Sequence, residues 1–103
     1  MSTISELKKR AQSKNIPFDL DENWLSKKLN LKKCEVSDIP FNHDKGAWCT
    51  QSIDRINSDH GYTKHNCKVI LLGLNTGKGQ NCTYDEIYNI AKAFVKEHER
   101  KNI

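Results

Sequence analysis

Apolar side chains recur at helical intervals in two runs near the start of the chain. The first run covers residues 4–14 and follows Thr3, whose hydroxyl stands three residues before Glu6, the spacing of a capping box. The second run covers residues 20–29 and follows Asp19, a residue type that favours the N-cap position. We therefore expect two helices, the second of which buries Leu20, Trp24 and Leu25.

The middle of the chain changes from irregular sequence to extended spacing. Residues 34–47 contain several turn formers, and we expect Phe41 and Trp48 to anchor this irregular segment to the core. Residues 52–56 and 67–70 have the character of strands, the second being rich in β-branched side chains, and a polar loop separates them. This pattern predicts two strands joined as a hairpin.

After the second strand the apolar spacing becomes helical again. Residues 71–75 predict a short helix that presents Asn75 in its first or second turn and ends at Gly77 and Gly79. We expect its leucines to lie in the core, namely Leu71, Leu72 and Leu74.

A third capping box precedes the last apolar run. Thr83 and Glu86 have the required spacing and predict a helix over residues 84–99. Its inward face is expected to consist of Ile87, Ile90, Ala91, Phe94 and Val95. The chain as a whole predicts an α+β fold with one hairpin.

Length and composition are those of one soluble globular domain. The chain has 103 residues, of which 36% are hydrophobic and 29% are charged. Its longest apolar run, residues 69–72, is too short to span a membrane, and its start lacks the apolar stretch of a secretory signal, so we expect a cytoplasmic protein. The formal net charge of +4 favours a polyanionic partner without requiring one.

Four cysteines are scattered along the chain, and no two of them are separated by only two to four residues. Close pairs of that kind are typical of structural zinc sites, so structural zinc is not expected. Disulfides are disfavoured in a reducing cytosol. We expect buried or half-buried free thiols at Cys34, Cys49, Cys67 and Cys82.

The segment from residue 52 to residue 78 contains the residues with the clearest chemical potential. A strand that ends near Asp54 and a helix that presents Asn75 can bring a carboxylate and an amide oxygen side by side. Both are hard ligands, which suit a cation such as Mg²⁺ or Mn²⁺. Such an ion neutralises the charge that builds on phosphate during phosphodiester cleavage.

The same segment resembles the phage-type HNH, or His-Me finger, endonuclease family. The resemblance rests on Asp54 and Arg55, the Gly-Tyr-Thr turn of residues 61–63, Asn66 and Asn75. Asp54 and Asn66 are 12 positions apart, and Asn66 and Asn75 are 9 apart, which matches the family spacing.

The resemblance covers most of the chain, because residues 14–19 and 34–41 are also similar to the leader of small stand-alone members. It implies one HNH-type nuclease domain over residues 1–103 that hydrolyses phosphodiester bonds in DNA, by nicking or double-strand cleavage, with a water nucleophile and one Mg²⁺ or Mn²⁺ ion. It also implies a phage or mobile-element origin and a ββα-metal core over about residues 48–80. The expected domain is completed by a helical leader (4–33) and a C-terminal helix (84–99).

The resemblance also assigns roles to individual residues. Asp54 and Asn75 look like the metal ligands, and Asn66 looks like the residue that holds the loop in place. The expected catalytic set is Asp54, Arg55, Asn66 and Asn75, and DNA contacts are expected from Arg55, Lys64 and Lys78.

Arg55 stands where the commonest family pattern has the histidine that activates water. An arginine stays protonated and is a poor base, so Arg55 would instead bind the scissile phosphate or stabilise the charge of the transition state. The general base is left open among His43, His60, His65, Tyr62 and a metal-bound water.

Two other functions fit the same residues. One is a nucleic-acid-binding module that keeps the ββα-metal fold and has lost cleavage through Arg55. The other is a small protein-interaction domain whose basic surface meets an acidic partner. Cleavage separates the nuclease from the first alternative, and salt-dependent DNA binding separates it from the second. No base-reading helix is evident, so the protein would be weakly specific as a monomer, or gain specificity as a homodimer or with a partner protein.

Overall fold

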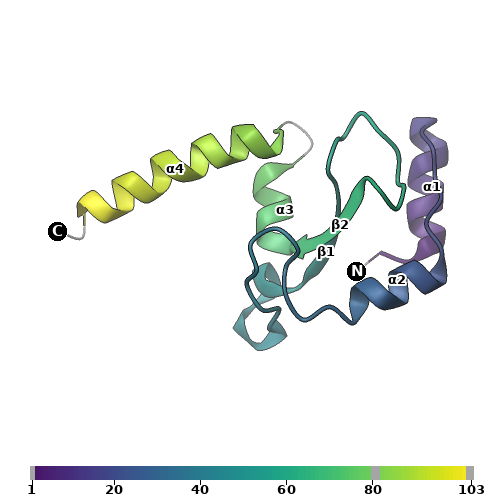
Figure 1. The fold of residues 1–103 in the computed structure, drawn as a ribbon, viewed down its shortest axis with the longest axis horizontal. Coiled ribbons are helices and arrows are strands. Elements are labelled where there is room, and N and C mark those ends of the chain that lie inside the picture. The colour runs from purple at the N-terminus through teal and green to yellow at the C-terminus, as the bar shows by residue number, and fades with distance from the viewer. Residues whose placement is uncertain (1, 80–81, 102–103) are drawn as a thin grey trace.

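The computed structural model describes residues 2–79 and 82–101, and it places helices on both sides of one short hairpin (Figure 1). The strands pair antiparallel in a two-stranded sheet, so the predicted α+β class is confirmed at that level. The described elements in chain order are α1 (Ile4–Lys14), α2 (Glu22–Leu29), the short 3₁₀ helices η1 (His43–Lys45) and η2 (Ala47–Cys49), β1 (Gln51–Arg55), β2 (Cys67–Leu71), α3 (Leu72–Lys78) and α4 (Tyr84–Lys101).

Helix α1 begins and ends where the sequence predicts. The Thr3 hydroxyl accepts a hydrogen bond from the Glu6 N–H at 3.2 Å, which satisfies one of the free donors of the first turn. At the other end Asn15 adopts the left-handed conformation, with φ 54°, and its N–H donates to the Ala11 carbonyl. The apolar face of the helix is buried through Leu7 and Ala11.

Helix α2 begins two residues later than predicted, because Asp21 and not Asp19 is its N-cap. The Asp21 carboxylate accepts a hydrogen bond from the Trp24 N–H at 2.8 Å. Asp19 instead accepts from the Lys64 N–H at 2.7 Å, in the loop after β1. Phe18 forms a β-bridge to the same loop, which keeps the chain before α2 extended.

The hairpin and the helix that follows it bring the two ends of the predicted segment together. Asp54 of β1 lies opposite Lys68 of β2, and β2 passes directly into α3. Helix α3 contacts both strands and η2. The prediction that Gly77 ends this helix is wrong, because Gly77 lies inside α3 and Gly79, with φ 60°, is the C-cap.

Buried apolar side chains form two clusters, and β2 contributes to both. Four of the five β2 residues are buried, so this strand is the centre of the core. The first cluster connects α1 and the chain before α2 to the hairpin, and the second connects the irregular segment to the end of β2. Their buried members are Leu7, Ala11, Leu20, Tyr62 and Cys67 in the first, and Cys34, Cys49, Ile70 and Leu71 in the second.

Two side chains predicted to lie in the core are largely at the surface. Trp48 is 49% exposed, whereas Phe41 from the same segment packs against the second cluster as expected. Leu72 is also exposed, although Leu71 just before it is buried. The chain changes from strand to helix between these two leucines, so their side chains no longer share one set of neighbours.

Helix α4 departs most from its prediction. Its capping box is confirmed, since the Glu86 N–H donates to the Thr83 hydroxyl at 3.1 Å and the Thr83 N–H donates to the Glu86 carboxylate at 2.8 Å. The expected inward face is wrong, because none of the described α4 residues is buried and Phe94 is 72% exposed. The helix extends away from the rest of the chain (Figure 1). None of the described helices combines the length and the apolarity needed to cross a membrane.

Candidate functional site

A small polar pocket lies where the end of β1, the end of α3 and one residue of α1 meet. Its volume is about 180 Å³. It combines three of the four residues of the predicted catalytic set with a predicted DNA-contacting lysine. The lining residues are Arg10, Ile53, Asp54, Arg55, Ser58, Tyr62, Asn75, Lys78 and Gly79.

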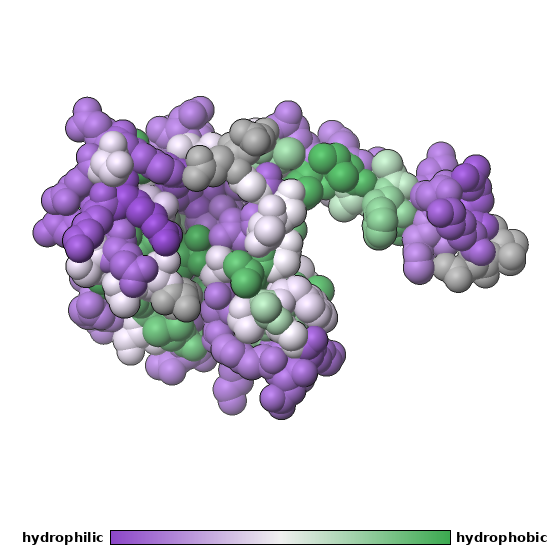
Figure 2. Space-filling view, turned by 180° about the vertical axis from the view of Figure 1, so that it is seen from behind, coloured by the Kyte–Doolittle hydropathy of each residue, from purple (hydrophilic) through white to green (hydrophobic). Residues whose placement is uncertain are grey.

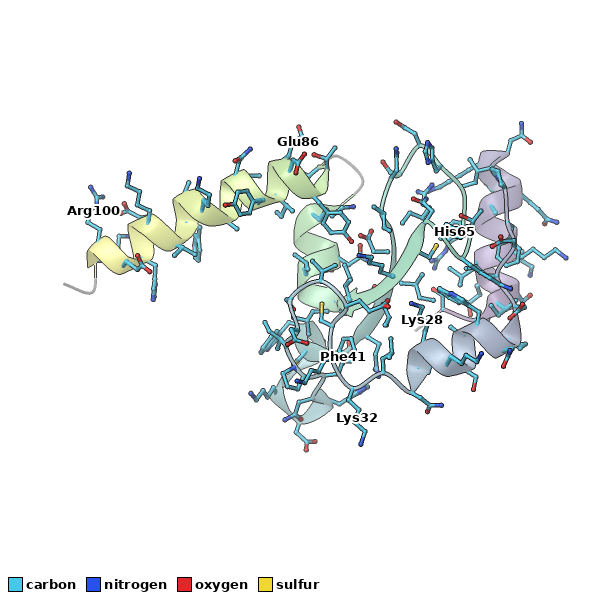
Figure 3. All side chains as sticks on the ribbon, viewed as in Figure 1. Lys28, Lys32, Phe41, His65, Glu86 and Arg100 are labelled. Carbon is cyan, nitrogen blue, oxygen red and sulfur yellow. The ribbon has the colours of Figure 1, made fainter. Side chains whose placement is uncertain are left out.

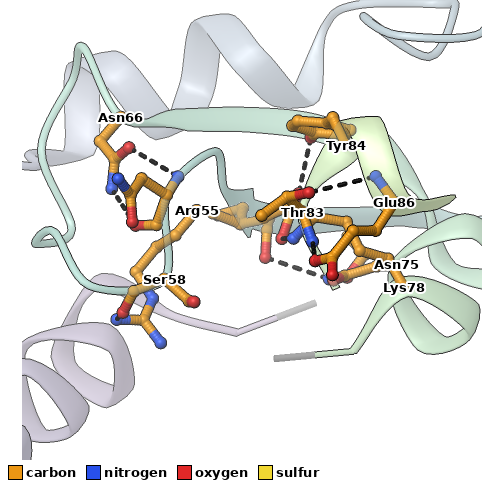
Figure 4. A network of polar contacts seen from close by, with 12 residues as sticks. Arg55, Ser58, Asn66, Asn75, Lys78, Thr83, Tyr84 and Glu86 are labelled. Carbon is orange, nitrogen blue, oxygen red and sulfur yellow. Dashed lines mark hydrogen bonds and ion pairs between the residues drawn. The ribbon is translucent and has the colours of Figure 1, made fainter. Parts of the chain in front are cut away.

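Asp54 is the acidic group of the pocket, and both of its oxygens have partners (Figure 4). Its Oδ1 lies 3.3 Å from the Nζ of Lys78, and its Oδ2 accepts a hydrogen bond from the Tyr84 hydroxyl at 2.6 Å. Asp54 and Lys78 are 6% and 3% exposed, so this is a buried ion pair. Burial of two charges is tolerated because each satisfies the other.

Tyr84 completes the site, although sequence reasoning missed it. Burial, and secondly the hydrogen bond to Asp54, raise the pKa of the Tyr84 phenol well above its usual range. The phenol therefore stays protonated and donates to Asp54. Tyr84 also lies 5.1 Å from the Lys78 ammonium, measured to the ring centroid. Its position 30 residues after Asp54 gives no local signal of this contact.

Asn75 faces the first three residues of β1 from the first turn of α3. Its amide nitrogen donates to the Ser52 hydroxyl at 2.7 Å and to the Ile53 carbonyl at 3.3 Å. These hydrogen bonds fix the side chain through its amide nitrogen. The amide oxygen is then the atom with which Asn75 can bind a ligand. Gly73 allows α3 to lie close to η2, because a Cβ there would lie 3.1 Å from the Cβ of Trp48.

Arg55 is buried and holds the loop that follows β1. Its Nη1 donates to the Ser58 carbonyl at 2.8 Å and to the His60 carbonyl at 3.2 Å. The guanidinium also lies 4.9 Å from the centroid of the Tyr62 ring. Arg55 therefore combines a structural task with a position in the wall of the pocket.

Asn66 does not line the pocket and instead fastens the same loop from its other end (Figure 4). Its amide oxygen accepts from the Asn57 N–H at 3.0 Å, and its amide nitrogen donates to the carbonyls of Asn57 and Gly61, each at 2.9 Å. Gly61 is needed there, because a Cβ would lie 2.2 Å from the Pro17 carbonyl oxygen. Arg55 and Asn66 thus shape the loop together.

The four side chains considered as general base do not converge. Of these, Tyr62 alone lines the pocket. His60 and His65 line a separate pocket beside Gly61, and His43 hydrogen-bonds to Gln51 at 3.1 Å.

Two cations outside the predicted set extend the positive charge around the pocket. Arg10 of α1 lines it. The pKa of Lys14 is lowered by burial and, secondly, by the charges of Arg55 and Arg10. The predicted contact Lys64 lies apart from these residues and pairs with Asp21 at 2.9 Å on the surface. The basic face of α1 is the part of the sequence that could have indicated Arg10.

Ligands for a metal are few. Within residues 2–79 and 82–101, no group of three or more His, Cys, Asp or Glu side chains is placed to hold an ion. The cysteines are free, and Cys34, Cys49 and Cys67 are buried, as the sequence predicts. Asp54 and Asn75 supply one carboxylate and one amide oxygen, a small donor set of the hard type.

Comparison of the chain with known proteins gives no match to a family model, to a curated protein or to a solved structure. The resemblance to HNH endonucleases therefore rests on the sequence motif and the similar leader segments. The fold adds that Asp54, Arg55 and Asn75 line one pocket together with Lys78.

Proposed function

We propose that this protein is a metal-dependent endonuclease that hydrolyses phosphodiester bonds in DNA with water as the nucleophile. The observation that supports it is the pocket of about 180 Å³ in which Asp54, Asn75, Arg55 and Lys78 meet. Two neutral or acidic oxygen donors stand there beside cations, which is the combination that a phosphodiester and a hard metal ion together require. The proposal includes the ββα-metal character of the hairpin and a cytoplasmic, phage-encoded setting.

The donor chemistry of the pocket fits Mg²⁺ or Mn²⁺. Asp54 offers a carboxylate, and the amide nitrogen of Asn75 is bound to β1, which leaves its oxygen as the second ligand. One or two protein oxygens are sufficient for Mg²⁺, which keeps several waters and binds substrate phosphate. When bound, the ion would act as a Lewis acid toward the phosphate.

The residues of the chain would perform the remaining tasks. Arg10, Arg55 and Lys78 line the pocket and would neutralise a phosphate that enters it. Arg55, which its hydrogen bonds fix in place, would stabilise charge that develops on the phosphate oxygens in the transition state. Tyr62 lines the pocket and is the first side chain to test as the proton acceptor.

One observation favours the second candidate, a nucleic-acid-binding module without cleavage. Lys78 and Tyr84 already satisfy both oxygens of Asp54, so the carboxylate has partners without a metal. In that function Arg10 and Arg55 would bind the DNA backbone, and Asp54 would serve to position Lys78.

Supercoiled plasmid incubated with the protein in Mg²⁺ or Mn²⁺, beside an EDTA control, tests the proposal. We expect nicked or linear product with metal, and a loss of at least about 100-fold in rate for Asp54→Asn, as is typical when an electrostatic group of the transition state is removed. The matched control is Asp59→Asn, which changes an exposed carboxylate outside the pocket and should cleave like the wild type.

The outcomes separate the two functions. Intact plasmid under all conditions, together with salt-dependent binding of labelled DNA, would replace the nuclease by the binding module. Equal cleavage by Asp54→Asn and the wild type would remove the pocket as the active site. Circular dichroism of each variant shows whether the fold is kept.

A further inference from the structure

Helix α4 exposes a continuous apolar face. Its apolar side chains recur three and four residues apart over more than two turns, which places them on one side of the helix. Ile90, Phe94 and Val95 are 55%, 72% and 50% exposed. Figure 2 shows these hydrophobic side chains gathered along the helix where it leaves the body of the molecule.

Beyond its first turn, most of this helix is exposed within one copy of the chain. It has 18 residues, and most of the stability of helices in proteins comes from the packing of an apolar face. The radius of gyration is 15.0 Å, against about 13 Å for a compact domain of 100 residues. A surface that covers α4 would supply the missing burial.

The charges of α4 are self-complementary. Its first half, residues 84–91, carries two carboxylates and no lysine or arginine, whereas residues 92–101 carry four lysines and arginines and two glutamates. Figure 3 shows Glu86 at the start of the helix and Arg100 near its end. Two copies of α4 in antiparallel orientation bring acidic halves beside basic halves, whereas a parallel pair sets like charges together.

A groove beside the first half of α4 offers a place for the second copy. It has a volume of about 590 Å³ and is mostly apolar, with Val36, Leu74, Ile87, Tyr88 and Ala91 among its lining residues. Its charged lining residues are Glu35, Lys68 and Asp85. In an antiparallel pair, the second half of the other helix lies against the first half of this one, so the other copy's Phe94 comes next to the groove.

We propose that α4 is a dimerisation helix that pairs antiparallel with α4 of a second copy of this chain. The interface is isologous, since each copy contributes the same apolar face and receives the other copy's Phe94 near its own groove. The inference is independent of the proposed nuclease activity. It has a consequence for the pocket, because a dimer would hold Tyr84, the first residue of α4, beside Asp54.

Sedimentation velocity of the full chain over a range of concentrations tests the dimer. We expect the wild type to be a dimer that dissociates on dilution, and Phe94→Asp to raise the dissociation constant by at least about tenfold, as loss of a central apolar anchor does. Because Phe94 is 72% exposed, this variant should keep its fold, which circular dichroism checks. Ile90→Asp provides a second variant on the same face.

The matched control is Asn89→Asp, which adds the same carboxylate on the opposite face of α4 and should dimerise like the wild type. A wild type that is monomeric at all concentrations would overturn the proposal and would leave a different protein as the occupant of this face. A dimer that neither Phe94→Asp nor Ile90→Asp weakens would also overturn it, because the interface would then lie elsewhere. DNA cleavage does not enter either readout, so failure of the proposed function cannot be confused with failure of the dimer.

Discussion

The hairpin with α3 and the helix α4 are neighbours in the chain, yet their side chains have different surroundings. Four of the five residues of β2 are buried, whereas no described residue of α4 is. Both segments are rich in apolar side chains at regular spacing. The comparison shows that such spacing predicts which face requires a partner, while the partner itself depends on how the elements pack.

The polar groups show the same contrast. Around the hairpin, the side chains of Asp54, Arg55, Asn66 and Asn75 each have hydrogen-bond partners, and no buried side-chain nitrogen or oxygen in residues 2–79 and 82–101 lacks one. On α4, the ion pairs of Glu97 with Arg100 and Lys101 are exposed and local. The hairpin region should therefore be rigid and sensitive to substitution. Helix α4 should tolerate substitutions with smaller losses of stability.

The largest effect is expected from breaking the buried ion pair. Lys78→Met leaves the Asp54 carboxylate buried without its cation, so the free energy of unfolding should fall by about 3–5 kcal/mol. Lys64→Met is the matched control, because it removes a pair that is exposed at the surface and should lower the free energy of unfolding far less. Urea unfolding measures both.

The Lys78→Met variant also tests the proposed role of Asp54 as a metal ligand. With the competing ammonium removed, Mn²⁺ should raise the melting temperature of Lys78→Met more than that of the wild type. An equal response of the two proteins would argue against metal binding at Asp54.

The next effect concerns two glycines of the hairpin and α3, one in close contact with other residues and one in open space. Gly61→Ala forces a Cβ to within 2.2 Å of the Pro17 carbonyl oxygen, so we expect a loss of about 3 kcal/mol or more. Gly77→Ala adds a methyl group in α3 where nothing lies within 4 Å, and it should gain about 0.5–1 kcal/mol from helix propensity. Denaturant melts should show a lower free energy of unfolding for Gly61→Ala and a higher one for Gly77→Ala than for the wild type. Equal losses in the two variants would contradict this expectation.

A smaller effect is expected from pH. Burial raises the pKa of the Cys67 thiol to about 12 from its ordinary 9.0. The folded protein thus keeps a proton that the unfolded chain loses, so this stabilisation is complete below pH 9 and disappears as pH rises from 9 toward 12. Between pH 9 and 10, Cys67→Ala should lose stability less steeply than the wild type, by up to about 1.4 kcal/mol per pH unit. Identical slopes would show that the thiol is not buried in solution.

The smallest expected effect is in hydrogen exchange. Dilution of the wild type below its dimer dissociation constant should speed exchange of amides in residues 88–101 by several-fold, because α4 then loses its partner. Amides of β2 should not respond, since their partners lie within the same copy. Mass spectrometry of proteolytic fragments resolves the two segments. An equal increase in exchange rate along the whole chain would contradict the expected difference between α4 and β2.

The sequence predicts the parts of this molecule that depend on local signals. The bounds of α1, the capping box of α4 and the antiparallel hairpin all agree with the structure, because caps and turn residues act on backbone groups a few positions away. The wrongly predicted start of α2 shows where local signals are not sufficient. Asp19 and Asp21 are equally good caps, and the decision between them depends on the contact of Asp19 with Lys64, 45 residues away.

The sequence by itself also determined much of the composition of the pocket, since the predicted site residues include Asp54, Arg55, Asn75 and Lys78, and these four side chains line it. Only the tertiary structure decided that Arg10 and Tyr84 join them and that Asn66 and Lys64 do not. It also decided that the apolar face of α4 stays uncovered within one copy. The physical reason is the distance along the chain over which each signal acts. Spacing along the chain orients neighbouring side chains, whereas contacts between distant residues follow from how whole elements pack.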